Sequence, residues 1–201
     1  MSMQLSVITD EIDARLGPAL DVCEELGIRA VELRTVDGVS IVDHTPEGVH
    51  AIRQELEHRG FRVSAIASPF LKCNRDDDPL EQERLHERAL EAAAILAAPV
   101  VRAFAYWREP DPSAALPDLG KALGAAAARA HDAGVTLALE NEHECNVATS
   151  DEAFAALAAM GAPDLRLIWD PGNAAMLTSC VSRLYSKTPE APWLLPRGFL
   201  A

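Results

Sequence analysis

Several features that would place the chain in a common protein class are missing from its sequence. None of its apolar runs approaches the roughly 20 residues that a membrane-spanning helix needs, so we expect no membrane partner. The segment 1–4 has no positive region followed by an apolar stretch, and no signal peptide is expected. The cysteines form no Cys-x-x-Cys pair, which favours reduced thiols in a cytoplasmic protein.

Positive charge is also scarce. The chain has 18 Lys and Arg residues against 31 Asp and Glu residues, a formal net charge of −13. This balance argues against a nucleic-acid backbone or an anionic membrane as the main partner. The length of 201 residues, 49% of them hydrophobic and 24% charged, is sufficient for one globular domain with a sizeable core.

The sequence does contain a repeated unit, in which a short apolar segment precedes a stretch with helical periodicity. The apolar segments, which we predict to be strands, are 4–8, 29–33, 61–67, 100–105, 135–139 and 165–169. Strands that are apolar throughout and joined by helices are typical of a parallel sheet covered by helices. Six such units indicate an α/β fold and fit a (β/α) barrel of the TIM type better than a small doubly wound sheet.

The predicted helices have recognisable ends. Thr45 and Asp78 each stand before a proline, as a capping side chain does at the start of a helix, and Ser150 begins a similar segment without the proline. The alanine-rich stretch 122–133 reads as a helix packed closely on the sheet. Glycines that follow a helical stretch and precede a strand, where a left-handed cap belongs, are Gly27, Gly60 and Gly134.

Two acidic residues follow the ends of neighbouring predicted strands. Glu140 comes directly after the fifth strand and Asp170 after the sixth. In a barrel, the loops after the carboxyl ends of the strands build the functional face. An acid that emerges from a buried strand is badly desolvated unless a cation pairs with it. That cation is either a divalent metal ion or an arginine, for which Arg34, Arg102 and Arg166 are the candidates.

Three segments resemble the sugar phosphate isomerases and epimerases with a xylose isomerase-like barrel. They are Val-Glu-Leu-Arg at 31–34, Leu-Ala-Leu-Glu-Asn-Glu-His at 137–143 and Ile-Trp-Asp-Pro-Gly-Asn-Ala at 168–174. The resemblance implies an eight-stranded barrel that binds one divalent ion, Mn²⁺, Mg²⁺, Co²⁺ or Zn²⁺. It implies that Glu140 and Asp170 are the first two metal ligands. It also implies metal-assisted proton transfer next to a carbonyl of a sugar or polyol, with Glu140 as the catalytic group.

Other residues of the same rim are expected to contact the substrate. They are Glu32, Arg34, Trp107, His143 and Asn173. The resemblance places Asn173 toward the sugar or behind a ligand. The other four have alternatives: Glu32 and Arg34 could pair with neighbouring charges, Trp107 could pack in the core or rim, and His143 could be a solvated loop histidine.

The sequence departs from the family pattern after residue 176. The segment 177–201 contains no histidine, a single carboxylate at Glu190, and prolines at 189, 192 and 196 that interrupt regular structure. We therefore predict a partial barrel over 1–176, with about six of the eight βα units, and a divergent proline-containing tail over 177–201. The seventh-strand histidine and eighth-strand glutamate of the family ligand set have no counterpart, so we expect weak metal binding and low activity.

Three functions follow from these observations. The first is a sugar or polyol isomerase or epimerase, and the second is a non-catalytic remnant or a partner subunit that completes a barrel. The third, an apurinic/apyrimidinic endonuclease-like repair protein, is disfavoured because 68–70 and 105–107 lack the histidines that those enzymes carry after strands three and four. Open sheet edges also predict a homo-oligomer.

Overall fold

The computed structural model describes residues 4–161 and 163–176, and its main sheet has six parallel strands. The strands are β1 (Ser6–Ile8), β2 (Ala30–Leu33), β5 (Arg62–Phe70), β6 (Val100–Ala103), β7 (Thr136–Glu140) and β8 (Leu165–Ile168). Their order across the sheet, β1-β2-β5-β6-β7-β8, is also their order along the chain. A doubly wound sheet reverses its order at a switch point, so this arrangement confirms the predicted partial barrel.

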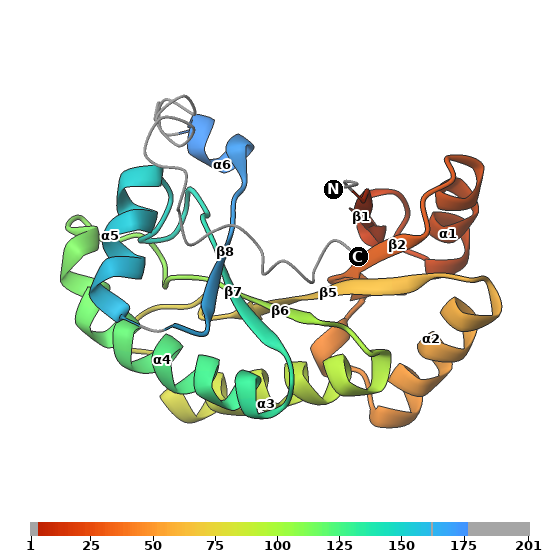
Figure 1. Ribbon diagram of the computed structural model, residues 1–201, viewed down its shortest axis with the longest axis horizontal. Coiled ribbons are helices and arrows are strands. Elements are labelled where there is room, and N and C mark those ends of the chain that lie inside the picture. The colour runs from red at the N-terminus through yellow and green to blue at the C-terminus, as the bar shows by residue number, and fades with distance from the viewer. Residues whose placement is uncertain (1–3, 162, 177–201) are drawn as a thin grey trace.

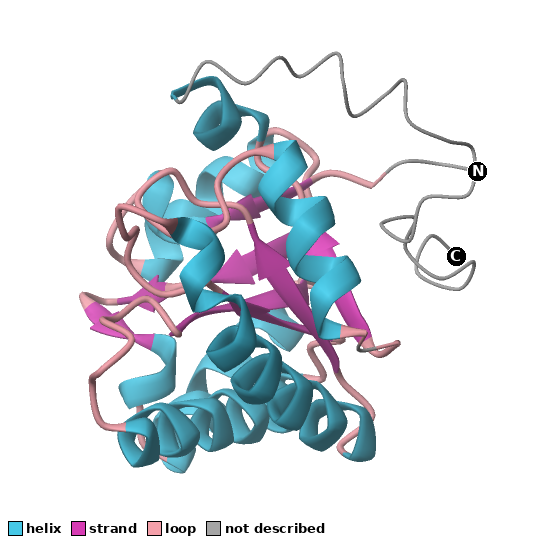
Figure 2. Ribbon diagram, turned by 90° about the vertical axis from the view of Figure 1, so that its left-hand side faces the viewer, coloured by secondary structure: helices cyan, strands magenta, loops and turns pink. Residues whose placement is uncertain are grey.

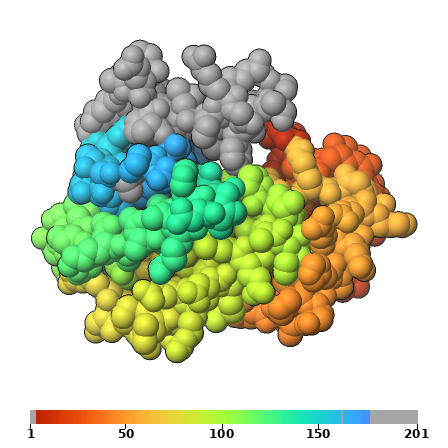
Figure 3. Space-filling view, turned by 60° about the horizontal axis from the view of Figure 1, so that its bottom comes forward, coloured from red at the N-terminus to blue at the C-terminus, as the bar shows by residue number. Residues whose placement is uncertain are grey.

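Five helices connect successive strands and lie along the outer side of the curved sheet, and a sixth, short helix follows the last described strand (Figure 1). They are α1 (Leu16–Glu25), α2 (Pro46–His58), α3 (Pro79–Leu96), α4 (Leu116–Asp132), α5 (Ser150–Met160) and α6 (Pro171–Met176). Figure 2 shows the strands inside this helical layer, and Figure 3 shows the outer surface running from orange at the right to green and blue at the left. Short elements that the sequence did not predict are the antiparallel hairpin β3 (Thr35–Val36) and β4 (Val39–Ser40), and the 3₁₀ turns η1 (Thr9–Glu11), η2 (Ile41–Asp43) and η3 (Pro112–Ala115).

The two faces of the sheet differ in character. Side chains alternate between the faces of a strand, and the outward set, such as Val101 and Leu137, joins the main core beneath the helices. A second, small apolar cluster contains Ala65, Val100 and Ala138. By the same alternation, Arg102 and Glu140 follow Val100 and Ala138 on the inner, concave face, which therefore changes from apolar to charged near the strand ends.

The local signals read from the sequence are present at the helix ends. Thr45 Oγ1 accepts from the backbone N–H of Gly48, and the Asp78 carboxylate accepts from that of Leu80. Helix α5 begins at Ser150, as predicted, and its capping side chain is that of the preceding residue, Thr149, which forms a reciprocal capping box with Glu152. The three predicted glycine caps all have positive φ, between 70° and 73°.

Strands β1 and β8 are the outermost strands of the sheet, and each pairs on one side only among the described residues. Association through these edges stays a prediction. The predicted tail over 177–201 lies outside the described residues. None of the described helices combines the length and the apolar character that crossing a bilayer requires.

Candidate functional site

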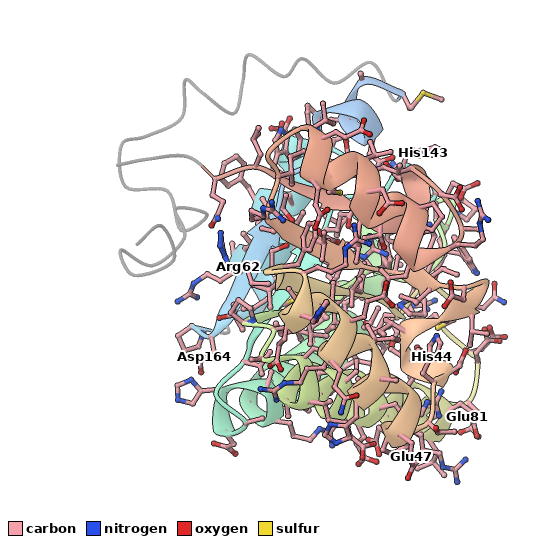
Figure 4. The ribbon with its side chains drawn as sticks, turned by 90° about the vertical axis from the view of Figure 1, so that its right-hand side faces the viewer. His44, Glu47, Arg62, Glu81, His143 and Asp164 are labelled. Carbon is pink, nitrogen blue, oxygen red and sulfur yellow. The ribbon has the colours of Figure 1, made fainter. Side chains whose placement is uncertain are left out.

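The carboxyl ends of the strands meet at one side of the molecule, and a pocket of about 470 Å³ opens there. Figure 4 shows His143 and His44 toward this side of the molecule. Arg62 and Asp164, where β5 and β8 begin, lie toward the opposite side. Four of the residues predicted from the sequence line the pocket, namely Arg34, Glu140, Asp170 and Asn173. The strand ends therefore bring the two predicted metal ligands to one pocket.

Glu140 is held by a buried arginine. Its Oε2 accepts a hydrogen bond from Arg102 Nη1 at 3.1 Å, and the two side chains are 12% and 7% exposed. The Arg102 guanidinium also donates to the backbone carbonyls of Ala67 and Ser68 on β5, at 3.1 and 3.4 Å. These contacts fix the guanidinium on the concave face. Of the two cations that the sequence allowed beside Glu140, a metal ion or an arginine, the structure shows the arginine.

A second carboxylate, that of Glu32 on β2, lies 4.0 Å from the same guanidinium. Burial raises the pKa of both Glu140 and Glu32, and the Arg102 charge opposes that rise. The Glu32 and Asp170 charges raise the pKa of Glu140 further. Glu32 thus belongs to this charge cluster rather than to the pocket lining.

Asp170 directly precedes α6 and is positioned by the first residues of that helix. Its Oδ1 accepts from the backbone N–H groups of Gly172 and Asn173 at 2.6 and 3.1 Å, and its Oδ2 accepts from Asn173 Nδ2 at 3.0 Å. The Asn141 side chain bridges both strand ends, since it accepts from Asp170 N at 2.7 Å and donates to the carbonyls of Asp170 and Ala148. The acid and the start of α6 are therefore locked to the end of β7.

Arg34 pairs with charges from the first βα loop. Its guanidinium lies 2.9 Å from Asp10 Oδ2 and 3.3 Å from Glu11 Oε1. The other Asp10 oxygen accepts from the backbone N–H of Thr35 at 3.3 Å. Arg34 reaches the pocket as predicted, and it is also paired with neighbouring charges.

The loop after β7 carries a second group of polar residues. Glu142 Oε2 accepts from Lys72 Nζ at 2.9 Å, and His143 Nδ1 lies 2.9 Å from Asn173 Oδ1. Glu142, His143 and Glu144 each offer a ligand atom, and these atoms all lie within 4.8 Å of one another. Among the described residues this loop triplet is therefore a group that could hold a metal ion, and a metal site at Glu140 and Asp170 stays a prediction. The His143 ring lies against α6 and is only half-buried, so it is not a purely solvated loop histidine.

Lys72 and Trp107 each follow a residue whose backbone takes a conformation that favours glycine. Leu71 and Tyr106, which directly precede them, have φ of 61° and 54°. Left-handed conformations at bulky residues often mark functional positions. The Lys72 ammonium lies 4.8 Å from the Phe104 ring centre and 5.6 Å from that of Trp107. Trp107 lines a neighbouring pocket of about 550 Å³ rather than the one that holds Glu140.

Lys72 and Glu142 also line the pocket but were not among the site residues predicted from the sequence, and Arg102 was predicted only as a candidate cation for the strand-end acids. Arg102 carried a readable signal, because it is the one charged residue in the apolar segment 100–105. Lys72 was obscured because the predicted third strand ended at residue 67, whereas β5 continues to Phe70. Glu142 was present on the predicted rim, but nothing in its spacing distinguished it from the other acids there.

Comparisons with known proteins agree with the fold. A family model described as the xylose isomerase-like TIM barrel matches residues 20–181. The zinc-containing crystal structure of the IOLI protein is similar over 92% of this chain and 69% of its own, with 18% identity and a TM-score of 0.73. No curated protein sequence matches this chain.

Two further solved structures are similar. An AP endonuclease of family 2 from Brucella melitensis aligns over 95% of this chain and 77% of its own, with 17% identity and a TM-score of 0.74. D-psicose 3-epimerase, crystallised with D-fructose, aligns over 87% of this chain and 65% of its own, with 17% identity and a TM-score of 0.66. At such identities these similarities establish the fold.

Proposed function

Because the chain belongs to the xylose isomerase-like TIM barrel family, we propose that its pocket binds a small sugar or polyol and supports isomerisation or epimerisation by proton transfer next to a carbonyl. The observation that carries the proposal is the convergence of Glu140 and Asp170, from neighbouring strand ends, on one pocket of about 470 Å³. Epimerases are among the proteins with a similar fold.

The two carboxylates fit a divalent cation that prefers oxygen ligands, such as Mn²⁺ or Mg²⁺. Glu140 and Asp170 would hold it, with water or substrate in the remaining positions. A bound cation would polarise the substrate carbonyl and offset the negative charge that develops on its oxygen. Arg102 already compensates Glu140, and the described residues provide only these two ligands of the family type. We therefore expect a dissociation constant above about 10 µM, which is a binding free energy weaker than about 7 kcal/mol.

The protein's own groups have separable roles in this proposal. Glu140 takes a proton from the carbon next to the carbonyl and returns it, as a general base and then a general acid. Arg102 positions that carboxylate through its 3.1 Å contact. Asn173 and Lys72 present polar groups to the pocket that would hydrogen bond to substrate hydroxyls.

Exchange of substrate hydrogen with D₂O tests the proposal, because it detects proton transfer even where net conversion is slow. A panel of free sugars, sugar phosphates and polyol ketones is incubated with the protein and Mn²⁺, and mass spectrometry follows deuterium uptake. We expect uptake that falls at least 100-fold in Glu140→Gln, since general acid–base catalysis contributes about 10² to 10⁴. The control Glu57→Gln breaks an exposed pair with Arg53 and should leave exchange unchanged. Uptake that is equal in both variants would contradict the proposal.

A second candidate is a non-catalytic role, and the Arg102–Glu140 pair is the observation that favours it. A buried arginine 3.1 Å from the carboxylate neutralises the charge that a metal ion would otherwise balance. In that case no sugar takes up deuterium, and Mn²⁺ titration followed by calorimetry shows no binding that depends on Glu140.

A further inference from the structure

The side chain of Glu142 has one oxygen without a hydrogen bond. The residue is 8% exposed, and its Oε2 is bound by Lys72 at 2.9 Å. Its Oε1 is fully buried and accepts no hydrogen bond, although His143 Nδ1 lies 2.6 Å away. The group closest to this buried oxygen is thus an imidazole nitrogen, which is itself a common metal ligand. The two atoms face each other without a hydrogen bond, and a cation bound to both would give this buried oxygen a ligand contact.

The atoms around that oxygen are metal-ligand types. His143 Nδ1 and a carboxylate oxygen of Glu144 lie with it inside a group whose members are all within 4.8 Å of one another. Asn173 Oδ1, from α6, lies 2.9 Å from His143 Nδ1 and adds a fourth candidate donor. A hydrogen bond from Cys145 N to the carbonyl of Glu142, 2.9 Å long, closes the turn that holds the triplet together.

We propose that Glu142, His143 and Glu144 bind a divalent transition-metal ion of the zinc type, at a site separate from Glu140 and Asp170. Zinc–nitrogen and zinc–oxygen bonds of about 2.0–2.2 Å in a tetrahedral arrangement place neighbouring ligand atoms roughly 3.3 Å apart. The contacts of 2.6 and 2.9 Å on either side of His143 Nδ1 are slightly shorter than that. Small side-chain rotations would open the group to receive the ion.

The two sites differ in the ions that they favour. An imidazole nitrogen together with carboxylates suits zinc, whereas a pair of carboxylates suits manganese or magnesium. Asn173 links the sites, because its Oδ1 faces His143 while its Nδ2 donates to Asp170 Oδ2 at 3.0 Å. Metal at the loop would place positive charge in the pocket wall, since Glu142 lines the pocket.

Titration of the full chain with Zn²⁺ at pH 7, followed by calorimetry, tests the proposal. His143→Gln should raise the zinc dissociation constant at least tenfold. His131→Gln is the matched control, because His131 also has a carboxylate neighbour, Asp164 at 3.5 Å, but lies outside the triplet. The control should change the constant less than twofold. Glu140→Gln should also leave it within twofold, which separates this site from the proposed catalytic one.

X-ray absorption of the zinc complex provides a second readout, and we expect one nitrogen among its ligands that disappears in His143→Gln. Should that variant fail to fold by circular dichroism, Glu144→Gln replaces it, because Glu144 is the exposed member of the triplet. Equal zinc affinity in the His143 or Glu144 variant and the His131 variant would overturn the proposal. So would wild-type zinc binding that is lost in Glu140→Gln alone.

Discussion

Arg102 and Glu140 form a buried ion pair across neighbouring strands, with Nη1 of the arginine 3.1 Å from Oε2 of the glutamate. The pair lies where the concave face of the sheet changes from apolar to charged side chains. The pair therefore affects both the stability of the protein and the net charge of the pocket lining.

Arg102→Met should destabilise the protein by about 3–5 kcal/mol, because removal of one partner leaves the Glu140 carboxylate buried without its cation. Urea unfolding at pH 7 measures the change. The double variant Arg102→Met with Glu140→Gln should recover part of the loss, since no uncompensated charge remains. The control Arg84→Met, which breaks an exposed pair with Glu81, should cost less than about 1 kcal/mol. Equal losses in the two single variants would contradict the assignment.

His86 should make the protein less stable in mild acid. The residue is fully buried, and burial together with the Arg129 charge lowers its pKa from 6.5 to about 4, against a smaller opposing effect of its hydrogen bond to the Ala126 carbonyl. The unfolded chain therefore takes up a proton below pH 6.5 that the folded chain takes up only near pH 4. Stability from this group is present above pH 6.5 and is lost as the pH falls toward 4.

Between pH 7 and pH 5 the free energy of unfolding should fall by about 2 kcal/mol through His86 alone. Unfolding curves at both pH values measure it, and His86→Leu should remove that part of the pH dependence. The matched variant His131→Gln, at an exposed histidine, should keep it. A pH profile that His86→Leu leaves unchanged would show that other groups are responsible.

Thr149→Ala should cost about 1 kcal/mol, because it removes the side chain that caps α5. Thr149 Oγ1 accepts from Glu152 N at 3.2 Å, and Glu152 Oε2 accepts from Thr149 N at 2.9 Å. Thr149→Ser retains the hydroxyl and should cost less than half as much. Thermal unfolding followed by circular dichroism distinguishes the two, and equal losses would exclude the capping contribution.

Two glycines should respond to alanine in opposite directions. Gly134 has a φ of +73°, whereas Gly124 lies inside α4, and a new methyl group would meet nothing within 4 Å at either position. Gly134→Ala should therefore destabilise by about 1–2 kcal/mol through backbone strain alone. Gly124→Ala should stabilise by up to about 1 kcal/mol through helix propensity. Denaturant midpoints of the two variants that shift in the same direction would contradict this reasoning.

Local signals predicted the elements well and their ends less well. Each of the six predicted strands is present, because parallel strands buried on both sides are apolar throughout. The third strand was predicted to end at residue 67, because serine and proline, which follow at 68 and 69, are poor strand formers. In the structure the corresponding strand, β5, reaches Phe70. Ser68 Oγ donates to the Arg102 carbonyl at 2.6 Å, and Phe70 pairs with Ala103 of β6 beyond it. The hairpin β3–β4 was missed because each of its strands has only two residues.

The sequence by itself determined the order of strands and helices, their caps, and the placement of Glu140 and Asp170 at neighbouring strand ends. Those features depend on residues near one another in the chain, where apolar periodicity and capping chemistry act. Only the tertiary structure decided that Arg102, rather than Arg34 or Arg166, pairs with Glu140, and that Glu142 and His143 meet Lys72 and Asn173. Such partners are set by strand register and sheet curvature, which bring together side chains 30 to 70 positions apart.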